Sequence, residues 1–161
     1  MINFHQWRGK LPHVHTPGSA YLLTSRLRKS KPELNAAERT AVLKACLHWN
    51  GRGWKMYAAV VMPDHFHLIT SLEEETALTK QAVAHLMRSI KGYSAREVNK
   101  LRGVKGSLWQ AEYHDRSLLG EQAFKGAVKY LLNNPAKAGL AERPEDYPWL
   151  WTDWAGFSAP I

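Results

Sequence analysis

Two histidines separated by one residue, His65 and His67, form the pattern that most directly suggests chemistry. In an extended strand, residues i and i+2 point to the same face, so the two imidazoles would stand side by side with their Cα atoms roughly 7 Å apart. Imidazoles at this spacing can hold one metal ion and leave positions open for a third ligand, a substrate oxygen and water. The pattern also fits two polar residues on an exposed strand face, and the spacing alone leaves both interpretations open.

A tyrosine, Tyr130, is the second candidate, in the role of a nucleophile. It falls in a segment of helical periodicity whose apolar side points away from it. Its own side carries small residues, so the phenol has room around it, and Asn134 lies one turn later and can reach the same point in space. The alternative is a boundary tyrosine whose ring packs while its hydroxyl stays hydrated. The apolar side consists of Phe124, Val128, Leu131 and Leu132, and the small residues are Ala123, Gly126 and Ala127.

Three other residues are weaker candidates. Tyr113 is a rival nucleophile, in a polar and aromatic segment that could instead be a platform for nucleic acid. Asp64 could be a metal ligand or a turn residue, and its place before a strand favours the turn. Cys46 lies among apolar helical positions and is expected in the core.

Secondary-structure patterns predict the elements that must position these residues. The order is strand, helix, strand, strand, helix, strand, which indicates a ferredoxin-like βαββαβ antiparallel sheet of the α+β class, with an added C-terminal helix that carries Tyr130. Asn35 and Glu38 have capping-box spacing at the start of the first helix, and Asn134-Pro135 are expected to stop the last. The predicted strands are 20–27, 55–61, 65–72 and part of 108–118, and the predicted helices are 35–49, 77–101 and 121–133.

Length and composition restrict the class of protein. The 161 residues predict one domain, with an irregular arm over 1–18 and a Pro- and Trp-rich segment over 141–161 that wraps the surface. A single cysteine excludes an internal disulfide and a thiolate zinc cluster. No apolar stretch is long enough to span a membrane and the start does not resemble a signal peptide, so a cytoplasmic location is expected.

Basic residues outnumber acidic ones, 22 to 14, giving a net charge of +8. Between positions 80 and 110 there are seven bases and one acid, Glu97, and such clustering is typical of a polyanion partner, although it also fits a protein with a high isoelectric point. On the predicted long helix, Lys80, Arg88 and Lys91 fall on the polar side.

Several motifs in order resemble a known family. The segment Val60-Val61-Met62-Pro63-Asp64-His65-Phe66-His67-Leu68-Ile69 is similar to the His, bulky apolar, His (HUH) segment of single-tyrosine transposases of small bacterial insertion sequences. Three later blocks resemble the REP-associated tyrosine transposases, so the resemblance covers about residues 8 to 151. The blocks are Leu108-Trp109-Gln110 with Tyr113 and Asp115-Arg116, then 130–140, then Asp146-Tyr147-Pro148-Trp149.

The resemblance implies a role for each candidate. His65 and His67 would bind Mg²⁺ or Mn²⁺, and Asn134 would stand where many relatives have a glutamine as third ligand. Tyr130, in preference to Tyr113, would attack a phosphate of single-stranded DNA and form a 5′-phosphotyrosine. The substrate would be a hairpin derived from repetitive extragenic palindromes (REP), bound by a nucleoid-associated monomer or homodimer. The DNA backbone would lie beside the metal on Lys80, Arg88, Lys91, Lys105 and Arg116.

Three functions remain open from the sequence. The first is a metal-dependent enzyme that nicks and rejoins DNA. The second is a domesticated regulator that binds DNA hairpins on the same fold without the chemistry. The third is a metal-dependent phosphoesterase that uses water in place of the tyrosine.

Overall fold

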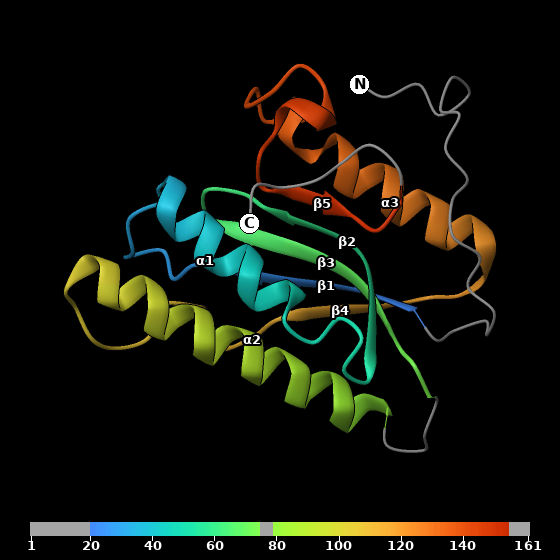
Figure 1. The fold of residues 1–161 in the computed structure, drawn as a ribbon, viewed down its shortest axis with the longest axis horizontal. Coiled ribbons are helices and arrows are strands. Elements are labelled where there is room, and N and C mark those ends of the chain that lie inside the picture. Colours follow the sequence, from blue (N-terminus) through green and yellow to red (C-terminus); the bar gives the residue numbers. More distant parts are fainter. Residues whose placement is uncertain (1–19, 75–78, 155–161) are drawn as a thin grey trace.

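Five strands form one antiparallel sheet in the order β4-β1-β3-β2-β5 (Figure 1). The computed structural model describes residues 20–74 and 79–154, so the predicted arm over 1–18 and the last residues of the predicted wrap lie outside the described residues. The strands are β1 (Ala20–Arg26), β2 (Trp54–Val61), β3 (His65–Leu72), β4 (His114–Leu118) and β5 (Leu150–Thr152). The helices are α1 (Ala36–Leu47), α2 (Thr79–Arg102), α3 (Gly120–Lys137) and a short 3₁₀ turn (Pro144–Asp146).

The first six elements confirm the predicted ferredoxin-like order. β3 lies in the centre of the sheet, antiparallel to β1 on one side and to β2 on the other. Helices α1 and α2 pack on one face of the sheet and α3 packs on the other, so the sheet has an apolar core on each side (Figure 1). Among the described residues, no helix is long and apolar enough to cross a membrane.

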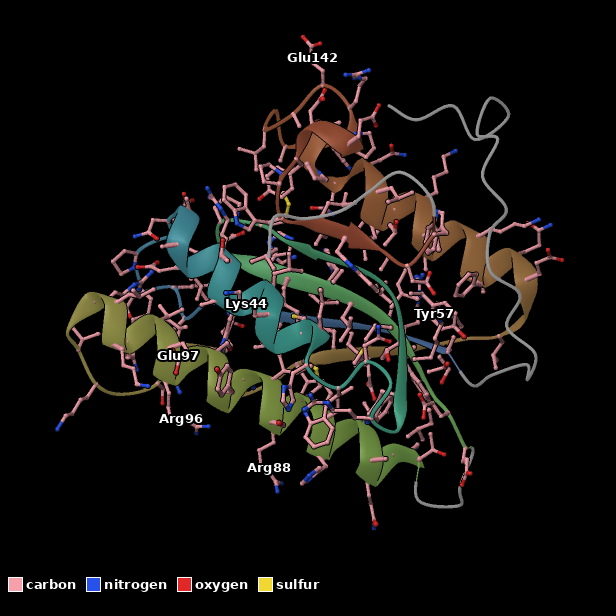
Figure 2. The ribbon with its side chains drawn as sticks, viewed as in Figure 1. Lys44, Tyr57, Arg88, Arg96, Glu97 and Glu142 are labelled. Atoms are coloured by element: carbon pink, nitrogen blue, oxygen red, sulfur yellow. The ribbon has the colours of Figure 1, made fainter. Side chains whose placement is uncertain are left out.

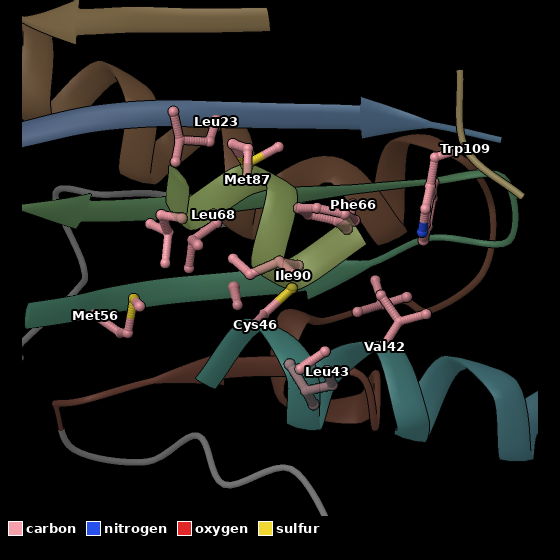
Figure 3. Close-up of a cluster of buried hydrophobic side chains, with 14 of the residues drawn as sticks. Leu23, Val42, Leu43, Cys46, Met56, Phe66, Leu68, Met87, Ile90 and Trp109 are labelled. Carbon is pink, nitrogen blue, oxygen red and sulfur yellow. The ribbon is translucent and has the colours of Figure 1, made fainter. Parts of the chain in front are cut away.

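Alternation along β3 distributes its side chains between the two cores. Phe66 and Leu68 point into the core under α1 and α2, where the Phe66 ring meets Trp109 edge to face at 5.2 Å (Figure 3). Ile69 belongs to the core under α3. Because side chains alternate with a period of two, His65 and His67 share the face of Ile69 and therefore look toward α3.

The start of α1 is capped as predicted. The Asn35 side chain accepts a hydrogen bond from the Glu38 amide, and the Glu38 carboxylate accepts one from the Asn35 amide. The structure adds an ion pair that ties the two helices on this face together, because Arg102 at the end of α2 donates to both oxygens of the buried Glu38 carboxylate. The capping box is thus also an anchor between helices.

Helix α3 continues through Pro135 to Lys137, so the prediction that Asn134-Pro135 end it is wrong. A proline within a helix removes the hydrogen bond from its own nitrogen, here the bond to the Leu131 carbonyl. Pro135 is buried, and the turn after it closes through the Ala138 amide to Asn134 and the Leu140 amide to Pro135. The continued helix keeps Asn134 on the same side of α3 as Tyr130.

The C-terminal segment does more than wrap the surface. β5 adds a fifth strand beside β2, and the buried Tyr147 hydroxyl donates to the Val61 carbonyl at the end of β2. The Val61 amide in turn donates to the Trp149 carbonyl. These bonds hold the end of β2 that leads into the histidine pair.

Replacing Glu38 by Gln should lower the free energy of unfolding by about 1.5–3 kcal/mol at pH 7, because the half-buried Arg102 loses its charged partner. Arg102 holds the pKa of Glu38 below its usual 4.5. A carboxyl group with a lowered folded-state pKa stabilises the fold above its unfolded pKa, and the stabilisation is lost as the pH falls through the folded value. Urea denaturation should therefore show the difference between wild type and Glu38→Gln shrinking between pH 7 and pH 3.

The matched control is Glu97→Gln, which breaks the exposed pair with Lys100 and should change stability by no more than about 1 kcal/mol. An equal effect of the two substitutions at pH 7 would contradict the role given to Glu38.

Candidate active site

The histidine pair sits at the start of β3, directly after a tight turn from β2. The turn is fixed by backbone hydrogen bonds from three directions. The Met62 amide donates to His65, the Leu27 amide at the end of β1 donates to Asp64, and the Leu34 amide before α1 donates to Pro63. The His65 and His67 rings lie 4.8 Å apart between centroids, so the structure brings the pair together as the spacing predicted.

Each histidine is oriented through its Nδ1 atom by a neighbouring oxygen. His67 Nδ1 lies 2.7 Å from Thr24 Oγ1, and His65 Nδ1 lies 2.6 Å from Asp64 Oδ1. An N–H at Nδ1 that donates to these oxygens leaves the Nε2 lone pair of each ring available. Such oxygen partners on the far ring nitrogen are typical of metal-binding histidines.

His67 is buried, and its environment fits a metal ligand. Burial lowers its pKa from 6.5 to about 3, and the positive charges of His65 and Arg26 add to the effect. The imidazole is therefore neutral at neutral pH, which is the form that binds metals. Its Nε2 atom is buried and has no hydrogen-bond partner, an unfavourable state that a bound cation would relieve.

Tyr130 lies against this pair. Its ring meets the His67 ring at 5.2 Å and 69°, while nearly half of the tyrosine (46%) remains exposed, so the phenol is both near the histidines and reachable by a substrate. Asn134, half-buried, follows one turn later on α3. Among the described residues, no group of three or more His, Cys, Asp or Glu side chains is placed to hold a metal. A third protein ligand taken from the described residues would therefore be of another type, such as the Asn134 amide.

The rival candidates lie elsewhere. Tyr113 packs with the core under α1 and α2, across the sheet from the histidines. The pKa of Tyr113 is raised, chiefly by burial, so its phenol forms the nucleophilic phenolate less readily. Cys46 is fully buried in the same core, as predicted, and burial raises the pKa of its thiol. Asp64 is a turn residue, as favoured, but its carboxylate also orients His65.

The five predicted DNA-binding residues do not form one surface beside the histidines. Lys80, Arg88 and Lys91 belong to α2, which lies across the sheet from the histidines, so the prediction that they flank the metal is wrong. Arg88 and Arg96 extend from α2 away from the sheet (Figure 2). Lys91 instead donates to the Gln110 and Ala111 carbonyls, and exposed Lys105 lies in the loop after α2.

Only Arg116 among the five shares the histidine face, because it pairs with Leu22 on β1, a residue of the core under α3. Two exposed residues that the sequence reasoning did not assign also lie on this face. Arg26 pairs with His65 across the strands, and His114 pairs with Thr24. Arg26 and Arg116 place positive charge near the histidine pair. Strand alternation could identify Arg26 and His114 only once the register was known.

Comparison with known proteins places this chain in a family. The family model described as "Transposase IS200 like" matches residues 26–134, more than half of the chain. A REP-associated tyrosine transposase of Escherichia coli K12 is 24% identical over 135 residues, which are 81% of this chain and 74% of the relative. A Haemophilus influenzae chain given the same name is 22% identical over 116 residues, 69% of this chain and 64% of the relative. This chain thus spans just under two thirds of that second relative.

A solved structure has the same fold. A REP-associated tyrosine transposase bound to a REP hairpin superimposes with a TM-score of 0.64 and 21% sequence identity, covering 88% of this chain and 81% of that chain. The family match includes the histidine pair, Tyr130 and Asn134, and confirms the resemblance seen in the motifs. The chain belongs to the family of IS200-like transposases.

Proposed function

We propose that this protein is a REP-associated tyrosine transposase that nicks and rejoins single-stranded DNA through Tyr130. One observation carries the proposal most directly. The exposed Tyr130 phenol packs on His67, whose buried Nε2 atom has no partner in the described protein. The proposed nucleophile and the proposed metal ligand are thus in ring contact, and the family to which the chain belongs supports DNA as the substrate.

His65 and His67 would hold a divalent cation, with the Asn134 amide as the proposed third ligand. Thr24 and Asp64 keep the imidazoles in the tautomer that presents Nε2. When bound, the cation would polarise the scissile phosphate and offset the charge that develops there. Of Mg²⁺ and Mn²⁺, we favour Mn²⁺ for a site with two nitrogen ligands, because Mg²⁺ demands a shell of oxygens.

Tyr130 would attack the phosphorus atom of the scissile phosphate. A bond forms between phosphorus and the phenolic oxygen, and the bond from phosphorus to the 3′ oxygen breaks, leaving a 5′-phosphotyrosine and a 3′ hydroxyl group. The phenol proton passes to solvent, which the exposed side of the ring reaches, and the departing oxygen takes a proton from water. A 3′ hydroxyl can later attack the same phosphotyrosine, so rejoining needs no nucleotide triphosphate.

The positive residues on the histidine face would guide the strand to Tyr130. Arg26 and Arg116 are exposed there, and neither is neutralised by an ion pair within the described residues. The structural relative was solved with a REP hairpin, which supports a hairpin of this kind as the substrate. A location at the nucleoid follows from this proposal.

Removing the Thr24 hydroxyl should weaken binding of the divalent cation. Thr24→Val keeps the shape of the side chain but leaves His67 Nδ1 without its partner, so we expect Mn²⁺ affinity to fall about 10- to 100-fold. Isothermal titration calorimetry measures the affinity without relying on DNA cleavage. Thr24→Ser retains a hydroxyl and should bind close to wild type, whereas wild-type affinity in Thr24→Val would rule out the orienting role.

The covalent step can be tested with labelled single-stranded hairpin DNA and Mn²⁺. Wild type should form an adduct that survives denaturing electrophoresis, and Tyr130→Phe should form none because no hydroxyl remains to attack. Tyr113→Phe is the matched control and should still form the adduct.

Each other outcome favours a different function. An adduct in Tyr130→Phe would eliminate Tyr130 as the nucleophile. Cleavage without an adduct would indicate that water attacks, as in a phosphoesterase. Tight, salt-sensitive hairpin binding without cleavage would indicate a regulator.

A further inference from the structure

A pocket of about 530 Å³ opens between α2 and the loop 107–113, on the face of the sheet opposite the histidines. Its size is in the range of small-ligand sites. Three basic and two aromatic residues line it, and none of the lining residues is acidic. The basic residues are Arg28, Arg88 and Lys91, and the aromatic residues are Trp109 and Tyr113. The charge of the lining therefore suits an anion with a planar group.

The side of α2 that faces the pocket carries small side chains. Ala84, Gly92 and Ala95 face the pocket from the helix. A Cβ atom added to Gly92 would meet only the Arg96 guanidinium, at an ordinary 3.6 Å, so no contact within the described protein requires glycine there. Glycine destabilises a helix interior relative to alanine. The presence of Gly92 is explained if a ligand occupies the part of the pocket next to its Cα atom.

Hydrogen bonds tie the opposite wall to α2. The Lys91 ammonium group donates to the Gln110 and Ala111 carbonyls, and the Trp109 indole donates to Ser94 on α2. Lys91 therefore uses its ammonium group to hold the loop, and burial lowers its pKa. Arg28 and Arg88 are exposed, and their guanidinium groups make no hydrogen bond within residues 20–74 and 79–154. Two free guanidinium groups remain at a preformed pocket, and they are the donors best suited to phosphate.

The pocket adjoins the end of the sheet that carries the histidine pair. Leu27 bridges to Trp109 in the pocket wall, and its amide donates to Asp64 beside His65. Arg26 faces the histidines, whereas Arg28, two residues later, lines the pocket. A strand that passes around the end of β1 would thus reach both.

We infer that this pocket binds an unpaired nucleotide of the same DNA strand, with its phosphate on Arg28 and Arg88 and its base beside Tyr113 over Gly92. Base stacking on an aromatic ring and phosphate binding by arginine are the usual contacts to single strands. The choice of DNA as the ligand rests on the proposed function. The pocket would add affinity and position the strand, without touching the reacting phosphate.

The test is fluorescence anisotropy with a labelled single-stranded oligonucleotide in EDTA, where cation-dependent cleavage is prevented. Gly92→Ala should raise Tm by about 2–4 °C, because it removes a helical glycine, yet weaken binding at least fivefold by placing a methyl group where the base would lie. Arg28→Ala should weaken binding and lower the slope of log K against log salt by about 0.7. Lys44→Ala, on α1, removes the same charge away from the pocket and should leave binding within about twofold of wild type (Figure 2).

Wild-type affinity in both Gly92→Ala and Arg28→Ala would overturn the inference. A second result would also overturn it: a deoxynucleoside monophosphate binds wild type but not Gly92→Ala, while both proteins bind the oligonucleotide equally well. The pocket would then bind free nucleotides and not the DNA strand. These outcomes are independent of the adduct assay, so failure of the pocket and failure of Tyr130 chemistry can be told apart.

Discussion

The register of β3 in the centre of the sheet is the constraint on which the rest of the structure depends. Pairing His67 with Thr24 places both histidines on the face of α3 and sends Phe66 and Leu68 into the opposite core. A slip of one residue would turn both imidazoles into the apolar core under α1 and α2 and turn Phe66 toward α3. Because both cores oppose such a slip, folding itself assembles the imidazole pair beside Tyr130.

Much of this arrangement could be predicted from local patterns. The His-Phe-His spacing placed both histidines on one face, the capping box marked the start of α1, and helical periodicity put Tyr130 and Asn134 on one side of α3. The role of Thr24 could not be predicted, because it depends on which residue of β1 lies opposite His67. The course of α3 through Pro135 was missed because the packing that offsets a lost helical bond is not visible in local sequence.

The distribution of charge was predicted less well than the placement of the candidate histidines and Tyr130. Basic residues clustered in sequence are divided by the sheet, with Arg26, His114 and Arg116 on one face and the α2 bases on the other. Periodicity assigns each residue to a side of its own helix or strand, but the face of the sheet on which a helix packs is a tertiary property. The two faces meet at the end of β1, where Arg26 and Arg28 belong to different sites two residues apart.

The central claim is that Tyr130 becomes covalently joined to DNA. Mass spectrometry of a tryptic digest after incubation with hairpin DNA, Mn²⁺ and nuclease tests it most directly. Tyr130 is the only tyrosine between Lys129 and Lys137, whereas the tryptic peptide that ends at Arg116 contains Tyr113. The residual nucleotide should be attached to the peptide 130–137. A nucleotide on the peptide of Tyr113, or on no tyrosine peptide at all, would contradict it.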